Sequence, residues 1–520
     1  MNRRKNNHFV HNHGKNPRAR KAINIYIDGT EDSVRKNVKK YAADIALKFI
    51  NLESFSLLFK KETNGVKWFQ SMFKDANHKV TMRPILVTGW YLHNLSYRIM
   101  KYSNDYSSGI LDTEEDLARL LCSSVAVDQS EEHRYLEQFK NREDSNQAIM
   151  FYFNGIAGEQ VLYQLFPKHL DSFTRELYLL LSDDMRDERL DVNEIVLCET
   201  GVDAKTVIKY LQIAWVLSFM SSNVADIDLV NQVNEVVSED YLTVISRYTT
   251  TYSEIRADVN NIGRQQLYLK PFVRTSKGET ISVNVFLNMC LIDHCIFWIV
   301  RNHYLNMQSR EFTKIFGELF EEYLRLTFSD YLNVNEYKRI VEEDKKQNCK
   351  RADWELKIDN HSFLIEQKSS TMYLSTKQQI PNIDEMKKYY EKVVLVAKEQ
   401  LRQTEQAFGH DYIKIILLYD DYIASSMISD YLKISEVNSG GPYWILTIDE
   451  MEMLLYYSYS DRKGFDELVD EKIRLGKDSA NSGPGIEKML NDRGIFDNRH
   501  LKKERFQQYR SIYKEPFERN

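Results

Sequence analysis

Glycine and proline are scarce in this chain of 520 residues, which contains 19 of the first and 8 of the second. Tight turns depend on these residue types, so their scarcity disfavours a β-rich architecture and predicts long helices. From residue 22 to about residue 304, apolar residues recur three and four positions apart, as in EDLARLLCSSVAV. This spacing is typical of amphipathic helices. We therefore expect residues 22–304 to form a large, irregular all-α domain.

Charge and cysteine content exclude several classes of protein. A net charge of −6 excludes a histone-like polycation, so any nucleic-acid contact must come from local basic patches. The five cysteines include no CxxC pair, which disfavours a disulfide scaffold or a zinc ribbon. The most apolar stretch, about Val285 to Val300, is interrupted by Asp293 and His294 and falls short of the ~18–20 residues that a membrane span needs. With no secretory signal either, we expect a cytoplasmic protein without membrane contact.

The two ends of the chain and one helical hairpin have distinct patterns. Residues 1–21 are basic and predict a disordered tail, with a phosphate-binding arm as the alternative. Residues 461–520 predict a charged helical C-terminal extension. Around Gly201, the segment EIVLCETGVDAKTVIKYLQIAW fits either a helix-turn-helix, with Lys205 and Lys209 in the major groove, or a plain packed hairpin. The apolar residues on both flanks favour the packed hairpin.

The pattern changes after residue 311, and residues 305–460 predict a separate domain. A helix (EFTKIFGELFEEYLRLTF) leads to a short strand near residues 333–337. The segment DWELKIDNHSFLIEQKSS then predicts a β-hairpin that turns at Asp359, Asn360 and His361. A long helix follows over about residues 384–408, and the apolar runs YIKIILLY and YWILTI predict two more strands. This alternation indicates an α/β domain with a mixed β-sheet flanked by helices, so the whole chain is expected to be multidomain.

Three charged residues of the predicted hairpin are expected to meet. Asp353 opens the first strand, and Glu366 and Lys368 lie near the end of the second. Side chains alternate along a strand, so Glu366 and Lys368 project from one face, and the turn brings that strand end back beside Asp353. Two carboxylates suit Mg²⁺, with Mn²⁺ as an alternative, and a lysine can stabilise charge on a phosphate under attack. This grouping predicts metal-assisted hydrolysis of phosphodiester bonds.

Other residues could add metal ligands to this site. The same charged residues also have a simpler interpretation. The backbone carbonyl of Gln367 can complete the metal ligands, and the helix containing GELFEEYL offers Glu321 or Glu322. The simpler interpretation is a surface hairpin whose charged residues face water. That interpretation explains less readily a charged pair that ends the apolar run FLI, and we favour the site.

The segments GELFEEYL, RADWEL, FLIEQKSS and KEQLRQTEQAF together resemble the PD-(D/E)xK, or restriction-endonuclease-like, nuclease superfamily over about residues 311–455. Ala352 stands where the superfamily has a proline, which contributes no ligand. The resemblance favours Glu321 over Glu322 as the helical acid, and a glutamine on the following helix, Gln400 rather than Gln403. The catalytic set that the resemblance implies is Asp353, Glu366, Lys368, Glu321 and Gln400; its metal ligands are Asp353, Glu366, Glu321 and the Gln367 carbonyl.

The predicted function follows from this site and this resemblance. We expect a Mg²⁺-dependent DNA endonuclease whose nuclease domain resembles restriction endonucleases and which acts in restriction or anti-phage defence. The helical domain would recognise a phage or host protein or regulate cleavage, and a homo-oligomer is compatible with the sequence. Two alternatives stay open: a non-catalytic nucleic-acid-binding or scaffold protein with the same fold, and an RNase that uses the same residues.

Overall fold

The computed structural model describes most of the chain in fourteen segments. The predicted basic tail, residues 1–21, lies outside them. The described segments are residues 24–27, 30–58, 68–74, 80–103, 107–140, 145–164, 166–220, 238–257, 263–340, 351–377, 380–421, 423–435, 443–478 and 483–513.

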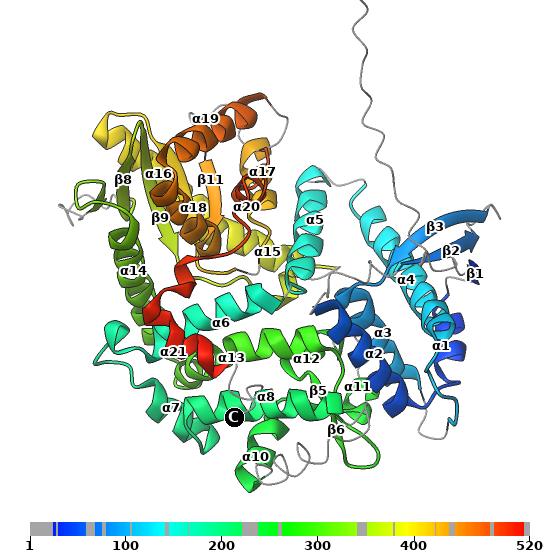
Figure 1. Cartoon of the computed structure of the whole chain (residues 1–520). Helices are drawn as coiled ribbons and strands as arrows, with labels where there is room; N and C mark the ends of the chain where they lie inside the picture. Colours follow the sequence, from blue (N-terminus) through cyan, green and yellow to red (C-terminus); the bar gives the residue numbers. More distant parts are fainter. Residues whose placement is uncertain are drawn as a thin grey trace, which may run out of the picture.

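The first part of the chain is mostly helical, as the apolar spacing predicts (Figure 1). Polar side chains that accept a backbone hydrogen bond begin several of the helices; Thr30, Thr88 and Thr113 cap α1, α3 and α4 in this way. The helices are α1 (Glu31–Val38), α2 (Ala43–Leu58), α3 (Gly89–Tyr102), α4 (Glu114–Glu137), α5 (Ser145–Val161), α6 (Phe166–Leu181), α7 (Val192–Thr200), α8 (Ala204–Met220), α10 (Glu239–Arg247), α11 (Tyr252–Ala257), α12 (Gly263–Leu269) and α13 (Val285–Asn306).

The description of residues 22–304 as all-α is wrong in one respect, because this part also contains two three-stranded sheets. In the first sheet, β2 (Trp68–Lys74) lies between β1 (Asn24–Ile27) and β3 (Val80–Leu86). In the second, β5 (Phe272–Arg274) lies between β4 (Thr249–Thr251) and β6 (Thr280–Ser282). Four of these strands, β1, β4, β5 and β6, have only three or four residues, too few for a clear alternating pattern, and the pairing of β1 with β2 joins distant segments.

One helix of the described residues, α13, is long and apolar enough to cross a membrane by length and composition, so the expectation that this stretch is too short is wrong: the helix continues past Val300 to Asn306. Within the protein most of its apolar stretch is buried against other helices. Its polar residues have protein partners: His294 Nδ1 lies 2.6 Å from a carboxylate oxygen of Glu176 on α6. Such packing is what the central helix of a folded core requires.

The second part of the chain contains a five-stranded mixed sheet, which confirms the prediction of an α/β region after the helical one. The strand order is β11-β10-β9-β8-β7, with β9, β10 and β11 parallel and β7, β8 and β9 antiparallel. The elements are α14 (Glu311–Tyr331), β7 (Tyr337–Arg339), β8 (Trp354–Ile358), β9 (His361–Lys368), α15 (Ile383–Tyr389), α16 (Val396–Phe408), β10 (Ile413–Leu418), α17 (Ser425–Ser435), β11 (Tyr443–Thr447), α18 (Ile448–Ser460), α19 (Arg462–Asp478), α20 (Ile486–Asn491) and α21 (Glu504–Ile512).

The predicted hairpin is β8 and β9, joined by Asp359 and Asn360. Asp359 adopts a φ of 49°, the left-handed conformation that aspartate tolerates in two-residue turns. The register pairs Ile358 with His361 and Trp354 with Ile365. This register places the residue before β8 beside the last residues of β9, as the site hypothesis requires.

Both faces of the five-stranded sheet are covered by helices. Trp354, Phe363 and Ile365 belong to the apolar cluster that also contains α14 and α18. On the other face, Leu364 and Ile416 pack with residues of α15, α16 and the π-helical turn Tyr390–Leu395 that joins them. Because Glu366 follows Leu364 by two positions, its carboxyl group projects into the layer between the sheet and α16.

The C-terminal helices pack into the body of the protein. Phe465 and Leu468 of α19, and Phe506 of α21, are buried in the same cluster as α14 and α18. Figure 1 shows α21 (red) beside α6 of the helical part. Most of the described residues after 461 are helical as predicted, and these helices have an apolar inner face.

Candidate metal-dependent active site

Asp353 and Glu366 form a buried carboxyl pair at one end of the hairpin. The Asp353 N–H donates to the Ile365 carbonyl at 3.0 Å, which holds the residue beside β9. Its side-chain Oδ2 accepts the Gln367 N–H at 2.8 Å. The Glu366 side chain is 3% exposed, and the Asp353 carboxyl lies close enough for its negative charge to act on it. We call these two residues the carboxyl pair.

The electrostatic environment of the carboxyl pair disfavours two negative charges. Burial, followed by repulsion from Asp353, raises the pKa of Glu366 to about 8. Burial also raises the pKa of Asp353 to about 6, although the Gln367 N–H and the Lys368 charge act in the opposite direction. Without a further cation, the pair therefore retains a proton near neutral pH.

Lys368 and Gln400 complete this group of side chains. Lys368 Nζ donates to Glu366 Oε1 at 2.5 Å and to Gln400 Oε1 at 3.1 Å. Gln400 lies on α16, and its Nε2 lies 3.5 Å from the Arg351 carbonyl oxygen. The alternative glutamine, Gln403, instead donates to Glu399 on the solvent side of α16. The structure thus brings Gln400, and not Gln403, to Lys368.

The acids of α14 have different surroundings. Glu321 pairs with Arg339 of β7, and it lies near enough to Asp353 for its negative charge to raise the pKa of that residue. Burial raises the pKa of Glu321 itself. Glu322 forms an exposed pair with Arg325 at 2.5 Å. Of the two, Glu321 is the one beside the carboxyl pair, but its carboxylate contacts Arg339.

The backbone groups of Gln367 point to one edge of β9, and its side chain projects from one face of the strand. In an antiparallel pair, a residue's N–H and C=O project from the same edge of the strand, so the Gln367 carbonyl lies on the edge facing Asp353. Its side chain projects from the other face, where its Oε1 accepts the Trp354 Nε1–H at 3.0 Å. The backbone carbonyl is therefore placed as the ligand hypothesis expects.

A divalent cation fits this group. Glu366 Oε2 is buried and has no hydrogen-bond partner within the described segments. A buried carboxylate oxygen without a partner is costly, and a hard cation bound between the two carboxyl groups would satisfy it and balance their charge. Asp353, Glu366 and the Gln367 carbonyl could hold Mg²⁺ or Mn²⁺, and Glu321 could contribute after releasing Arg339.

A second buried group of acids surrounds Arg175 of α6. Arg175 donates to both oxygens of Glu452, at 2.8 and 2.7 Å, and also pairs with Asp421. Asn498 donates to Asp449 at 2.7 Å and to Glu452 at 2.5 Å. We call these five residues the arginine network. Lys168 lies at its margin, and that charge together with Arg175 lowers the pKa of Asp449 to about 2, whereas burial raises the pKa of Asp421 to about 7.

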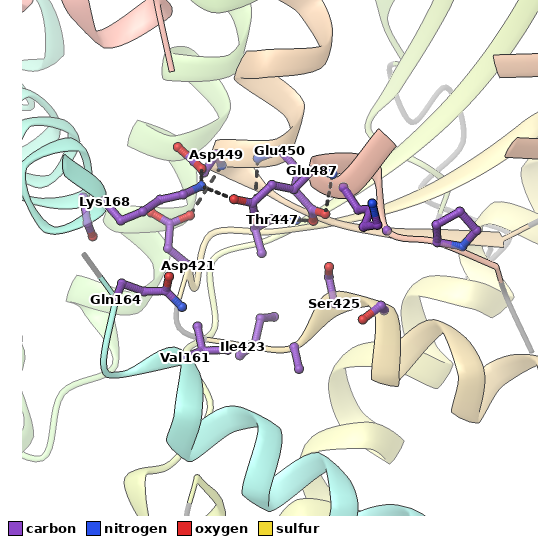
Figure 2. Close-up of a pocket in the computed structure, with 16 residues that line it drawn as sticks. Val161, Gln164, Lys168, Asp421, Ile423, Ser425, Thr447, Asp449, Glu450 and Glu487 are labelled. Atoms are coloured by element: carbon purple, nitrogen blue, oxygen red, sulfur yellow. Dashed lines mark hydrogen bonds and ion pairs between the residues drawn. The ribbon is translucent and has the colours of Figure 1, made fainter. Parts of the chain in front are cut away.

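A cavity of about 430 Å³ adjoins the arginine network. It lies where α5 and α6 face the ends of β10 and β11 (Figure 2). Its acids are already engaged: Lys168 pairs with Asp449 and, at 3.1 Å, with Glu487, while Glu450 caps α18 by accepting the Thr447 N–H. These pairings give the charged groups of the cavity a structural role.

The arginine network was missed by sequence reasoning, although the segment TIDEMEMLL contained a signal. Asp449, Glu450 and Glu452 follow a strand and alternate with apolar residues that must be buried. Acids in such a helix need cationic or polar partners. Their partner Arg175 lies far away in the sequence, in a helix whose other residues gave no indication of it.

Comparison with known proteins gives no match: no family model, no curated protein and no solved structure matches this chain. The class of protein must therefore be argued from the side chains themselves.

Proposed function

We propose that this protein is a metal-dependent nuclease with a PD-(D/E)xK, restriction-endonuclease-like domain that hydrolyses DNA. The observation that carries this proposal is the carboxyl pair, with its unsatisfied oxygen and the adjacent Lys368, at the end of a hairpin in a mixed sheet. Buried acids with strongly raised pKa values beside a lysine are typical of functional sites. The match to the motif order Asp353, Glu366, Lys368 and Gln400 agrees with this class.

The chemistry follows from the position of each group. Mg²⁺ held by Asp353 and Glu366 would supply positive charge to the phosphate under attack. Lys368, on the same side of β9 as Glu366, would stabilise the charge that develops on the phosphate oxygens and orient the attacking water. Gln400 is a positioning residue, because its Oε1 accepts from Lys368 and fixes the ammonium group. Glu321 would hold a second water or cation.

A surface formed by α13 and the segment that follows β9 has the chemistry that a nucleic acid needs. After β9 the chain continues to Tyr373, which is 55% exposed, and Trp298 of α13 is 40% exposed. Between them, the Arg301 guanidinium lies 4.8 Å from the Trp298 ring centre and donates to Thr371 at 3.3 Å. We call Trp298, Arg301 and Tyr373 the aromatic surface. Exposed rings stack on bases, and an arginine contacts phosphates.

The segment that presents Tyr373 is well supported. The Met372 N–H donates to Asp420 Oδ2 at 2.8 Å, and Lys377 Nζ donates to the same carboxylate at 2.7 Å. This anchoring fixes the direction in which Tyr373 projects. Stacking by aromatic rings is available to unpaired bases, so the aromatic surface favours single-stranded or locally unpaired DNA as substrate.

We also propose that the protein acts in restriction or anti-phage defence. Nuclease domains of this superfamily often occur with unrelated sensor regions, and the helical part would act as the sensor or regulator in restriction or anti-phage defence. Its partner would be a phage or host protein.

The experiment uses the full-length protein with plasmid, single-stranded DNA and RNA, each with Mg²⁺, Mn²⁺ or EDTA. We expect DNA cleavage with either metal, none with EDTA, and none with the Asp353→Asn variant. Cleavage of RNA but not DNA would establish the RNase alternative. Binding without cleavage under every metal condition would favour the non-catalytic scaffold, and cleavage that survives in Asp353→Asn would overturn the site.

A further inference from the structure

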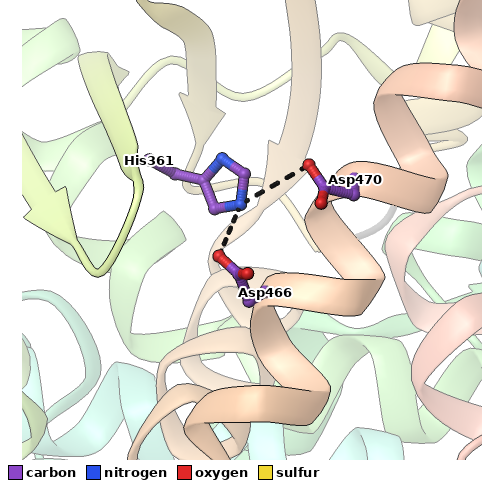
Figure 3. A group of neighbouring side chains, drawn as sticks. All are labelled: His361, Asp466 and Asp470. Atoms are coloured by element: carbon purple, nitrogen blue, oxygen red, sulfur yellow. Dashed lines mark ion pairs between the residues drawn. The ribbon is translucent and has the colours of Figure 1, made fainter.

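His361, Asp466 and Asp470 meet at the opposite end of the hairpin from the carboxyl pair. His361 is the first residue of β9, and the two aspartates lie one helical turn apart on α19 (Figure 3). Nε2 of His361 lies 2.9 Å from Asp466 Oδ1 and 3.8 Å from Asp470 Oδ1. The three possible ligand atoms lie within 4.8 Å of one another. We call these residues the histidine cluster.

The histidine cluster contains buried atoms that the protein does not satisfy. The His361 side chain is only 10% exposed and projects toward the two aspartates. Its Nε2 and Asp466 Oδ1 are both buried, and neither has a hydrogen-bond partner in the part of the chain that the structure describes. The two atoms form an ion pair with each other but no hydrogen bond. Two aspartates on one helix face also repel each other without a cation.

We propose that the histidine cluster binds a divalent transition metal such as Zn²⁺. Ligand atoms about 2.1 Å from a metal lie roughly 3.0 Å apart in an octahedral arrangement and roughly 3.4 Å apart in a tetrahedral one. The observed separations of 2.9 and 3.8 Å need only small side-chain movements to reach these values. One imidazole nitrogen with two carboxylates is a ligand set that suits such metals better than Mg²⁺.

This metal would join α19 to the hairpin and is separate from the proposed cleavage site. His361 and Glu366 are five positions apart on β9, so the two sites lie roughly 17 Å apart along the strand. Asp470 is 71% exposed, which leaves an open path for the ion and room for water ligands. The structural consequence is a cross-link between the C-terminal helices and the strand that carries the carboxyl pair.

The test measures zinc bound to the full-length Asp353→Asn, Glu366→Gln protein, in which the proposed catalytic metal site is disabled. After removal of metals with a chelator, equilibrium dialysis against zinc and elemental analysis give the stoichiometry. We expect one zinc per chain and a higher melting temperature with zinc than without it. Adding His361→Gln should abolish both effects, and adding Asp470→Asn should weaken binding by at least about tenfold.

His410→Gln is the matched control, because His410 is an exposed histidine near the same hairpin, 3.4 Å from Ser362. It should retain the zinc. Zinc binding that persists without His361, or the absence of any bound zinc in the parent, would overturn the proposal and leave the histidine cluster as a structural contact between β9 and α19. Unchanged melting temperatures of the metal-free variants would exclude misfolding as the cause of lost binding. None of these outcomes depends on nuclease activity.

Discussion

The carboxyl pair and the arginine network are both buried groups of acids in the second part of the chain, yet their charges are balanced differently. In the arginine network, Glu452 receives two hydrogen bonds from Arg175, and the pKa of Asp449 falls to about 2. In the carboxyl pair, Lys368 contacts only one acid, and the pKa of Glu366 rises to about 8. Asp421 of the arginine network also has a raised pKa, but it pairs with Arg175, whereas both acids of the carboxyl pair have raised pKa values and share one lysine.

This difference separates a structural role from a functional one. Burial is common to both groups, so it does not by itself identify a site. What identifies the site is charge that remains uncompensated, together with an oxygen that has no partner. The proposed metal supplies what the carboxyl pair lacks, whereas the arginine network needs no added ion. Substitutions in the carboxyl pair should therefore abolish cleavage without destabilising the fold, whereas substitutions in the arginine network should destabilise it.

The largest expected effect is loss of cleavage in Asp353→Asn or Glu366→Gln. Each should reduce the cleavage rate by at least ~10²- to 10³-fold, because the charge on the phosphate is no longer stabilised. In EDTA, however, Glu366→Gln should raise the melting temperature, because an uncompensated buried acid is removed. Glu355→Gln is the control, since Glu355 lies on β8 with partners Tyr412 and Lys357. A variant that loses activity and also unfolds would show that the carboxyl pair has a structural role like that of the arginine network.

Arg175→Met should have the largest effect on stability. Removing the guanidinium leaves Glu452 and Asp421 buried without their cationic partner, which costs about 3–5 kcal/mol of unfolding free energy. Urea unfolding followed by circular dichroism measures this cost. Arg119→Met is the control, because the Arg119–Glu115 pair is exposed and contributes little. Similar midpoints for the two variants would show that the arginine network is not the structural group we infer.

The stability of the metal-free protein should depend on pH through the carboxyl pair. The folded protein holds protons on Asp353 and Glu366 up to about pH 6 and about pH 8, respectively, while the unfolded chain loses them near their lower ordinary values. Stability from this source is complete below about pH 4 and is lost as pH rises to about 8, by a few kcal/mol. The unfolding free energy is measured in EDTA at several pH values for the parent and for the Asp353→Asn, Glu366→Gln protein. The difference between the two pH profiles is the contribution of the carboxyl pair.

Saturating Mg²⁺ should remove this loss, because the bound cation favours the ionised carboxylates. A parent protein whose stability in EDTA follows the same pH profile as the double variant would refute the raised pKa values. This measurement tests the electrostatic half of the comparison without any nucleic acid.

A smaller effect is expected at the aromatic surface. Trp298→Ala and Tyr373→Ala should each weaken the binding of single-stranded DNA by roughly 1–3 kcal/mol, because a stacked base loses its ring. Fluorescence anisotropy with the Asp353→Asn protein measures binding without cleavage. Phe496→Ala is the control, since Phe496 is an exposed ring (71%) that follows α20 and is not part of the aromatic surface. Equal affinities of all three variants for DNA would remove the aromatic surface from the proposal.

Local patterns predicted the hairpin and its site better than they predicted the remainder of the fold. Asp359 and Asn360 marked the turn, and alternation along β9 placed Glu366 and Lys368 on one face opposite Gln367, as the structure has them. These predictions depend on residues within one hairpin. The helical acid was less certain, because Glu321 and Glu322 are adjacent and only packing distinguishes them.

Features formed by distant segments could not be read from sequence. The pairing of Asn24 with Gln70 creates a sheet from strands with no strong alternating pattern. Arg175 and Glu452 belong to helices that each look unremarkable alone, and their contact depends on the way α6 meets α18. The C-terminal helices likewise showed many charges, whereas burial of Phe506 and Tyr513 depends on surfaces supplied by the rest of the chain.

The smallest expected effect concerns the hairpin of α7 and α8. Gly201 ends α7 with a φ of 83°, and Val207 and Leu211 of α8 are fully buried, as in any packed helical hairpin. Lys205 and Lys209 are exposed, but Asp203 occupies the start of α8, where its carboxylate accepts from the Thr206 N–H at 3.1 Å. A carboxylate at this end would repel DNA phosphates from the part of a recognition helix that approaches bases.

Lys205→Ala and Lys209→Ala should therefore change DNA affinity by less than about twofold, at the same salt concentration as the aromatic-surface variants. A much larger loss of affinity with an unchanged melting temperature would mean that DNA contacts α8. The substrate would then reach across the helical part as well as the sheet, and the aromatic surface alone would not define its path. Unchanged affinity would leave the aromatic surface as the proposed site for single-stranded DNA, where Arg301 lies 4.8 Å from the Trp298 ring centre.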